Sequence, residues 1–188
     1  MAFFDMLKQK ATQTAGTVAQ NADNKTYTVT LQQIPGSLAE LQAMPESALK
    51  EPQHAAALTI AALCLYPVNK EAALEMLTFL HGPKGLSTYD KQFIADRFRD
   101  KDYVPRSYFR GATPQNNYEP AAPYTLEFFE NPYSRDQEGY LILHIRSGGA
   151  DSPRQIKLRN KPSTGQWFLW EQFLLSDIRK PVSADPWA

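Results

Sequence analysis

The chain has 188 residues, of which 43% are hydrophobic and 12% aromatic. Enough apolar surface is therefore available for a core, which excludes a chain that is disordered throughout. The 20 Lys and Arg residues balance the 20 Asp and Glu residues, so the formal net charge is zero. This balance leaves no long-range field that would attract nucleic acid or an anionic membrane, and we expect no nucleic-acid partner.

Cysteine content and hydropathy indicate a cytoplasmic protein. Cys64 is the single cysteine, so no internal disulfide can form, as is typical of a reducing compartment. It lies in the apolar run 61–65, which favours a core thiol over a nucleophile. No apolar run reaches the roughly 18 residues of a transmembrane helix, and residues 1–10 lack the order of a secretory signal.

The first 26 residues are predicted to be a separate amphipathic segment and linker. Phe3, Phe4, Leu7 and Ala11 recur at helical spacing. An isolated helix this short is marginal in water and needs a surface to lie on. We expect that surface to be a protein partner or a second copy of the chain. Disorder in the isolated protein and weak membrane contact are the alternatives, in that order. Residues 27–188 are expected to form a single domain.

Helices are predicted to dominate the first part of that domain, after a strand at 27–31. Ser37, with Glu40 three residues later, forms a capping-box pattern. The stretch 55–65 is apolar almost all round, which indicates a buried central helix. The predicted helices are 37–44, 52–65, 70–80 and 87–98. The stripe expected to face the core on the last helix is Phe93, Ile94 and Phe98.

From residue 124 the hydrophobic period changes to two, which is typical of strands. The predicted strands are 124–130, 140–146, 154–159 and 166–173, and the turns between them indicate antiparallel neighbours. The predicted fold class is α+β, with an N-terminal helical layer packed on a C-terminal four-stranded antiparallel sheet. The strand at 27–31 is a candidate addition to its edge. Trp167 and Trp170 are an odd spacing apart, so we expect one to face the core and the other the surface.

A loop rich in proline and aromatic residues, 100–123, separates the two halves. Loops of this length are often functional or tightly packed on the body of a domain. Arginine and asparagine among aromatic rings are suited to a pocket for an anionic or planar ligand. The candidate ligand-binding residues are Arg106, Tyr108, Arg110, Asn117 and Tyr118. The alternative, which we favour, is that the arginines bind the loop to the sheet through hydrogen bonds.

No catalytic, metal or nucleotide motif is present in the sequence. It contains no phosphate loop, no H-E-x-x-H, no G-x-S-x-G and no C-x-x-C. His54, His81 and His144 share no ligand spacing. We expect no catalytic residue, no metal site and no cofactor.

Basic residues cluster on the second and third predicted strands of the sheet. The cluster consists of Arg146, Arg154, Lys157, Arg159 and Lys161. With Trp167 and Phe168 beside it, such a face is suited to single-stranded nucleic acid. The neutral charge of the whole chain favours the alternative, a solvated face.

Three stretches resemble an uncharacterised bacterial family described only as a domain of unknown function. They are residues 103–114, 147–154 and 165–171, with the sequences YVPRSYFRGATP, SGGADSPR and GQWFLWE. The resemblance covers about residues 35–188. It implies no activity, ligand or catalytic residue, because none is established for such a family.

Two functional classes are compatible with the sequence. The first, which we favour, is a non-catalytic interaction or scaffold module of a bacterial cytoplasmic protein. The second is a small-molecule-binding protein or an enzyme that uses the loop 103–118. A deep polar pocket lined by Arg106, Tyr108 and Asn117 would favour the second class, and a filled interior the first.

Overall fold

The computed structural model describes residues 24–187, which fold as the predicted α+β class. The strands of this part are β1 (Thr26–Leu31), β2 (Tyr124–Phe129), β3 (Tyr140–Ile145), β4 (Arg154–Lys161) and β5 (Gln166–Gln172). The α-helices are α2 (Leu38–Ala43), α3 (Pro52–Leu65), α4 (Lys70–His81) and α5 (Thr88–Arg97). Short 3-10 helices lie at Pro45–Ala48, Gly82–Lys84, Pro105–Tyr108, Pro114–Asn116 and Val182–Ala184.

The strands of the described chain form one antiparallel sheet in the order β1-β2-β3-β4-β5. The prediction of a four-stranded sheet is therefore wrong, because β1 is a full edge strand. It pairs with β2 in continuous register, from Thr26 opposite Phe129 to Leu31 opposite Tyr124. Val29 and Leu31 are buried while Thr28 and Thr30 are exposed, so the alternation of the sequence decides which face of β1 meets the core.

Side-chain caps define where α2 and α4 begin. The Ser37 hydroxyl accepts a hydrogen bond from the Glu40 amide at 3.2 Å, and the Asn69 side chain accepts one from the Ala72 amide at 3.1 Å. Each cap satisfies an amide that the first helical turn leaves without a partner. The limits of the helices predicted from the sequence agree closely with those observed.

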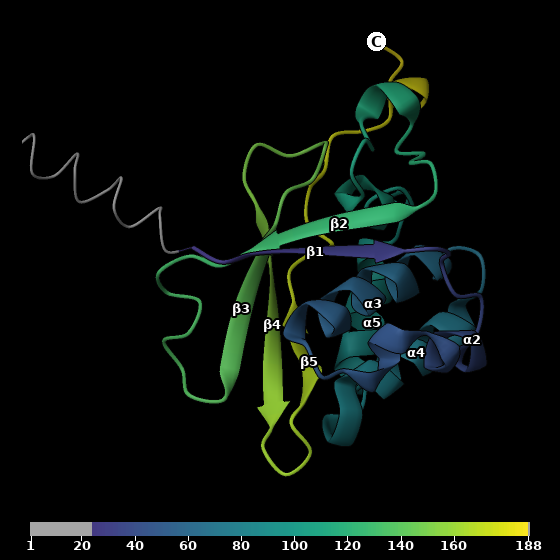
Figure 1. Cartoon of the computed structure of the whole chain (residues 1–188). Helices are drawn as coiled ribbons and strands as arrows, with labels where there is room; N and C mark the ends of the chain where they lie inside the picture. Colours follow the sequence, from purple (N-terminus) through teal and green to yellow (C-terminus); the bar gives the residue numbers. More distant parts are fainter. Residues whose placement is uncertain (1–23, 188) are drawn as a thin grey trace, which may run out of the picture.

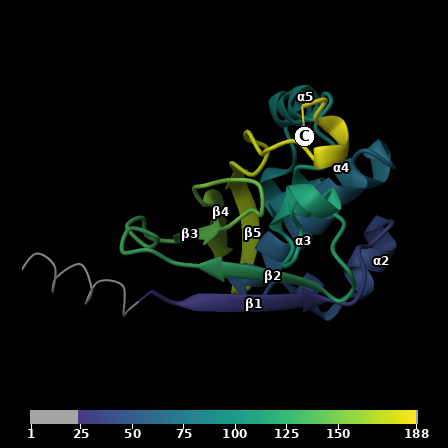
Figure 2. The same cartoon turned by 90° about the horizontal axis from the view of Figure 1, so that it is seen from above.

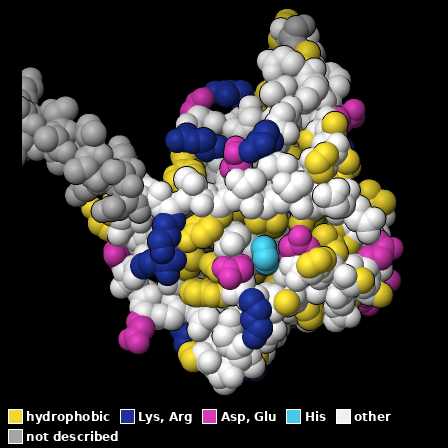
Figure 3. Space-filling view, viewed as in Figure 1, with side chains coloured by type: hydrophobic (Ala, Val, Ile, Leu, Met, Phe, Trp, Pro, Cys, Tyr) yellow, Lys and Arg dark blue, Asp and Glu magenta, His cyan; other side chains and the backbone are white. Residues whose placement is uncertain are grey.

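The helices lie together on one side of the sheet, as Figures 1 and 2 show. In Figure 1, β1 and β2 run across the direction of β3, β4 and β5, so the sheet is strongly twisted. Figure 3 shows the molecule from the same direction as Figure 1, with the side chains coloured by type. Lys and Arg groups are interspersed there with Asp and Glu groups.

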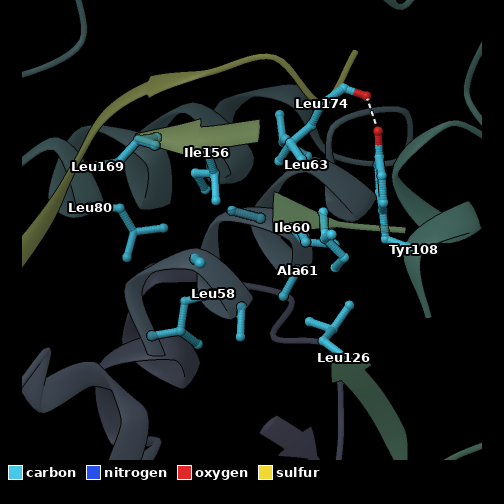
Figure 4. Close-up of a cluster of buried hydrophobic side chains, with 14 of the residues drawn as sticks. Leu58, Ile60, Ala61, Leu63, Leu80, Tyr108, Leu126, Ile156, Leu169 and Leu174 are labelled. Atoms are coloured by element: carbon cyan, nitrogen blue, oxygen red, sulfur yellow. Dashed lines mark hydrogen bonds between the residues drawn. The ribbon is translucent and has the colours of Figure 1, made fainter. Parts of the chain in front are cut away.

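α3 is the central helix of the core. Its residues from Ala55 to Leu63 are all buried. It packs against α4 and contacts β1, β3, β4 and β5. Figure 4 shows Ile60 and Leu63 of α3 among side chains that come from the strands, Leu126, Ile156 and Leu169. The apolar surface on all sides of α3 is what this enclosed position requires.

The sheet is open between β2 and β3, which pair over only two residues each. The loop after α5 occupies the opening. The Arg110 amide donates to the Thr125 carbonyl at 2.8 Å, and the Gly148 amide donates to the Ser107 carbonyl at 2.9 Å. The loop thus satisfies backbone groups that a longer β2–β3 ladder would otherwise pair.

Trp167 and Trp170 are both half-buried, and of the two it is Trp167 that packs against the hydrophobic core. The expectation that one tryptophan faces the core is therefore confirmed for Trp167. A β-bulge changes the register between β4 and β5. Leu158 lies opposite Leu169, but its neighbour in β4 lies opposite Glu171. Trp170 is the additional residue of this bulge, and Leu169, at 1% exposure, takes the inward position.

Candidate functional site

The structure distributes the five predicted ligand-binding residues over separate places. Arg106 and Asn117 line a cavity of about 460 Å³ beside the C-terminal segment. Tyr108 and Arg110 line a groove of about 600 Å³ along β2. Tyr118 is completely buried. No cavity described here brings Arg106, Tyr108 and Asn117 together.

Three tyrosines hold the loop after α5 on the C-terminal segment. Each is buried, and each hydroxyl donates a hydrogen bond to a backbone carbonyl. The pairs are Tyr103 with Ile178 at 3.1 Å, Tyr118 with Arg179 at 2.7 Å, and Tyr108 with Leu174, which Figure 4 shows. Burial raises the pKa of Tyr118 to about 12 and also raises that of Tyr108. These hydroxyls therefore stay protonated and serve as structural donors.

The two arginines of the loop have different surroundings. The Arg110 guanidinium lies 2.5 Å from the Glu127 carboxylate, but both side chains are more than half exposed, so the pair contributes little to stability. The Nε of Arg106 is buried without a hydrogen-bond partner in the described chain. Backbone groups and tyrosine hydroxyls, more than guanidinium groups, therefore bind the loop to the body of the domain.

The turn after β3 fits directly against this loop. A Cβ at Gly149 would lie 1.9 Å from the Tyr118 hydroxyl, and one at Gly148 would lie 1.8 Å from the Ala112 carbonyl oxygen. Any larger residue would force the turn and the loop apart. Residues 103–114 and 147–154 thus pack on each other through glycine.

A different cavity has the composition of a ligand-binding site. It has a volume of about 410 Å³ and lies between the end of α4, α5 and β5, and we call it the α4–α5 pocket. Its apolar side chains are Leu63, Leu77, Leu86, Phe93, Ile94 and Leu169, with Tyr89, Trp170 and Phe173. Its polar side chains are His81, Lys84, Asp90, Glu171 and Gln172. This size and this mostly apolar lining are typical of sites for small molecules.

The rim of the α4–α5 pocket exposes large aromatic side chains to water. Tyr89 is 74% exposed and Phe173 is 53% exposed. Few other large apolar side chains of the described chain are exposed to this degree. Leu77 and Leu169, deeper in the pocket, are both buried. The pocket therefore leads from an exposed aromatic rim to a buried aliphatic floor.

The end of α4 positions His81 beside the pocket. Gly82 follows with a φ of 57°, a conformation that ends the helix and that glycine adopts without strain. A Cβ at Gly82 would lie 2.4 Å from the ring of Phe168. Glycine at this position therefore lets the end of α4 lie directly on β5.

A capping box positions the opposite wall. The Ser87 hydroxyl donates to the Asp90 carboxylate at 2.6 Å, and the Ser87 amide donates to the same carboxylate at 3.1 Å. These bonds begin α5, which carries Tyr89 and Phe93 into the lining.

Cation–aromatic contacts hold Trp170 at the third wall. The Lys84 ammonium donates to the Trp170 carbonyl at 2.9 Å and lies 4.5 Å from the centroid of its ring. Tyr140 meets the same indole edge to face at 5.5 Å, and the Arg159 guanidinium lies 4.3 Å over Tyr140. Contacts of this kind restrict the orientation of the indole.

The imidazole of His81 is neutral at pH 7. Burial, with a smaller effect of the Lys84 ammonium, lowers its pKa from 6.5 to about 4 against the opposing effect of Asp90. The side chain is 6% exposed, and its Nδ1 is buried without a hydrogen-bond partner in the described residues. Burial raises the pKa of Asp90, but the hydrogen bonds from Ser87 outweigh this effect and keep it below its usual value.

The α4–α5 pocket was not among the sites predicted from the sequence. The sequence predicts that Phe93 and Ile94 face the core, and it offers His81 only as a candidate metal ligand. One local signal was available, because Tyr89 lies one turn before Phe93 and extends the aromatic surface beyond the predicted stripe. Trp170 comes from a strand far along the chain, and no local pattern links it to α5.

Other chemistry is limited in the described part. Among residues 24–187, His, Cys, Asp and Glu side chains form no group of three that could hold a metal ion. No helix within the same range combines the length and the hydropathy needed to cross a bilayer. Cys64 packs against the core, and burial raises its pKa to about 12, so its sulfur is a thiol at neutral pH.

The described residues thus form an α+β protein with a helical layer on a five-stranded antiparallel sheet. A small, mostly apolar pocket lies where the helical layer meets the sheet. The family model of DUF6935, a domain of unknown function, matches residues 33–182, and the chain belongs to this family. The resemblance to a domain of unknown function predicted from the sequence is thus confirmed. No curated protein and no solved structure matches the chain.

Proposed function

We propose that this protein is a non-catalytic binding module that takes a small, largely apolar molecule into the α4–α5 pocket. The observation that supports this function is the pocket of about 410 Å³ with a buried aliphatic floor and an exposed aromatic rim. A ligand in this position removes Tyr89 and Phe173 from water together with its own apolar surface. The hydrophobic effect therefore drives binding.

The polar groups near the pocket support binding over catalysis. A catalytic hydroxyl needs a base within hydrogen-bond reach that can take its proton. The Ser87 hydroxyl donates instead to Asp90, and both groups cap α5. His81, with a pKa of about 4, is a weak base at neutral pH.

Several expectations from the sequence remain predictions, in addition to the binding function proposed above. An interaction or scaffold role through the segment 1–26 is one, because residues 1–23 lie outside the described part. Bacterial origin and a cytoplasmic location are others. The alternative ligand site on the loop 103–118 also stays a prediction, although its residues line separate cavities.

NMR titration with a panel of small aromatic molecules, including naphthalene and 2-naphthol, tests the proposed function. Saturable shifts are expected at the Trp170 indole and at the amides of α5. Leu86→Trp places a large ring in the pocket and should abolish these shifts. Val68→Trp is the matched control, because Val68 is 84% exposed between α3 and α4, and this variant should bind like the wild type.

Two outcomes would contradict the proposed function. One is the failure of every molecule in the panel to produce saturable shifts in the wild type. The other is binding that persists unchanged in Leu86→Trp. Either result would favour the scaffold role predicted from the sequence.

A further inference from the structure

Resting on the proposed function of the α4–α5 pocket, we propose that its ligand is an uncharged aromatic molecule that bears a hydroxyl group, and that His81 binds this hydroxyl.

The aromatic character of the ligand follows from the walls of the pocket. Phe93 of α5 and Trp170 of β5 both line it, and Tyr89 and Phe173 stand at its rim. Aromatic rings prefer stacked or edge-to-face partners, and a ligand ring can meet the walls in this way. The volume of about 410 Å³ lies near the lower end of the range for ligand pockets, which suits a molecule of about one or two rings.

The charges at the pocket favour an uncharged ligand. The Lys84 ammonium is hydrogen-bonded to the Trp170 carbonyl, and the Asp90 carboxylate is hydrogen-bonded to Ser87. Glu171 is exposed to water. Because charges of both signs line the pocket, a charged ligand of either sign would meet a like charge there, and it would also lose its hydration against the leucine and phenylalanine side chains.

His81 supplies the polar contact. Its side chain is 6% exposed and lines the pocket, and its Nδ1 has no hydrogen-bond partner in the described chain. No side-chain hydrogen bond of the described chain uses this imidazole, so a hydrogen bond from the ring to a ligand in the pocket would give it a partner that the protein does not supply.

A hydroxyl is the group that suits a neutral imidazole best. One nitrogen of the ring donates and the other accepts, and either nitrogen can carry the proton. A hydroxyl both donates and accepts, so it pairs with whichever nitrogen it meets. A carbonyl or an amide N–H pairs with a given nitrogen in only one of the two tautomers, whereas a hydroxyl pairs with it in both.

Isothermal titration of naphthalene and 2-naphthol tests this inference, because the two molecules differ only in the hydroxyl. The ratio of their dissociation constants is the measured quantity. In the wild type 2-naphthol is expected to bind about three- to tenfold more tightly than naphthalene. His81→Leu should retain naphthalene binding and lose the preference for 2-naphthol. Tyr89→Phe removes another hydroxyl from the rim and should keep the preference.

The outcomes separate the inference from the function on which it rests. A preference for 2-naphthol that is unchanged in His81→Leu, or that is absent from the wild type, would overturn the role of His81. Failure of both molecules to bind would overturn the proposed function itself. If His81→Leu does not fold, His81→Phe provides the same comparison, because it keeps a ring and removes both nitrogens.

Discussion

Single residues decide how the layers of this protein approach one another. Gly82 allows the end of α4 to contact Phe168 of β5, and Gly149 allows the turn after β3 to contact Tyr118. Both glycines occupy places where a Cβ has no room. His81 is a different case, since its polar ring is enclosed with one nitrogen unpaired. Each of these residues has an effect that a substitution can measure.

Gly149→Ala is expected to lower the free energy of unfolding by about 1–3 kcal/mol, because the new methyl group overlaps the Tyr118 hydroxyl and Ile178. Gly36→Ala is the control. A Cβ there meets only the flexible Glu40 side chain at 3.5 Å, and we expect a change within about 0.5 kcal/mol. Urea denaturation measures both. Equal effects of the two substitutions would show that the close packing of the turn is not important.

His81 is expected to make stability depend on pH. Its pKa is about 4 in the folded protein and 6.5 in the reference state, so the unfolded chain binds the proton more readily. The free energy of unfolding should therefore fall as the pH drops from about 6.5 to about 4, by at most roughly 1.4 kcal/mol per pH unit, and this effect should level off below pH 4.

The difference between wild type and His81→Leu isolates this contribution. Chemical denaturation at several pH values measures it, and carboxylates such as Glu130 titrate in both proteins, so their contribution cancels in the difference. The charged groups closest in effect to His81 are Lys84 and Asp90, and both remain in the variant. Parallel pH profiles for the two proteins would mean that His81 does not carry a lowered pKa.

At the scale of elements, the loop after α5 is as much a part of the core as the strands. It fills the opening between β2 and β3 and accepts or donates backbone hydrogen bonds on both sides. Its three tyrosines reach carbonyls of the segment that follows β5. The aromatic content of the loop is therefore explained by packing, without a ligand.

Tyr108→Phe and Tyr118→Phe are each expected to lower the free energy of unfolding by about 1–3 kcal/mol. Each substitution leaves a carbonyl of the C-terminal segment without its donor while the ring stays in place. Tyr133→Phe provides the control, because Tyr133 is 71% exposed and should change stability by less than about 0.5 kcal/mol. Thermal and urea unfolding report the effect, and three indistinguishable variants would refute the structural role of these hydroxyls.

At the scale of the whole molecule, the domain is a helical layer on a sheet whose edge is formed by its first strand. β1 begins at Thr26, and the Lys25 carbonyl accepts a hydrogen bond from the Glu130 amide. The elements that build the described domain therefore lie after residue 24. This arrangement bears on the role of the segment 1–24.

Deletion of residues 1–24 is expected to leave the fold and the melting temperature unchanged and to remove self-association or partner binding. Circular dichroism measures the first effect. Light scattering of the full-length and truncated proteins at equal concentration measures self-association. A large fall in melting temperature would show instead that the segment belongs to the core of the domain.

The mixed surface charge leads to the expectation that single-stranded DNA and RNA do not bind at physiological salt. Two arginines of the basic cluster are engaged, since Arg154 donates to the Asp177 carbonyl at 2.8 Å and Arg159 lies over Tyr140. Fluorescence anisotropy with a labelled oligonucleotide measures binding. Affinity that falls steeply with salt and is lost in Arg154→Glu/Arg159→Glu would disprove this expectation.

The sequence by itself determined the class of the fold and the limits of its elements. Ser37, Asn69 and the Ser87–Asp90 pair are local caps. α2, α4 and α5 begin where these caps predict. The strands follow from the change of period, since alternation over a few residues depends only on neighbours in the chain. The resemblance to a domain of unknown function was also predicted from the sequence, and the family model matches residues 33–182.

The tertiary structure alone decided which distant segments meet. The pairing of β1 with β2 made the fifth strand of the described sheet, and the bulge beside Trp170 changed the register between β4 and β5. Arg106 and Tyr108, two positions apart, line different cavities. His81 and Trp170 line one pocket although nothing in the sequence joins them. Periodicity and capping act within a few residues, whereas a pocket is made by packing of elements that are far apart in the chain.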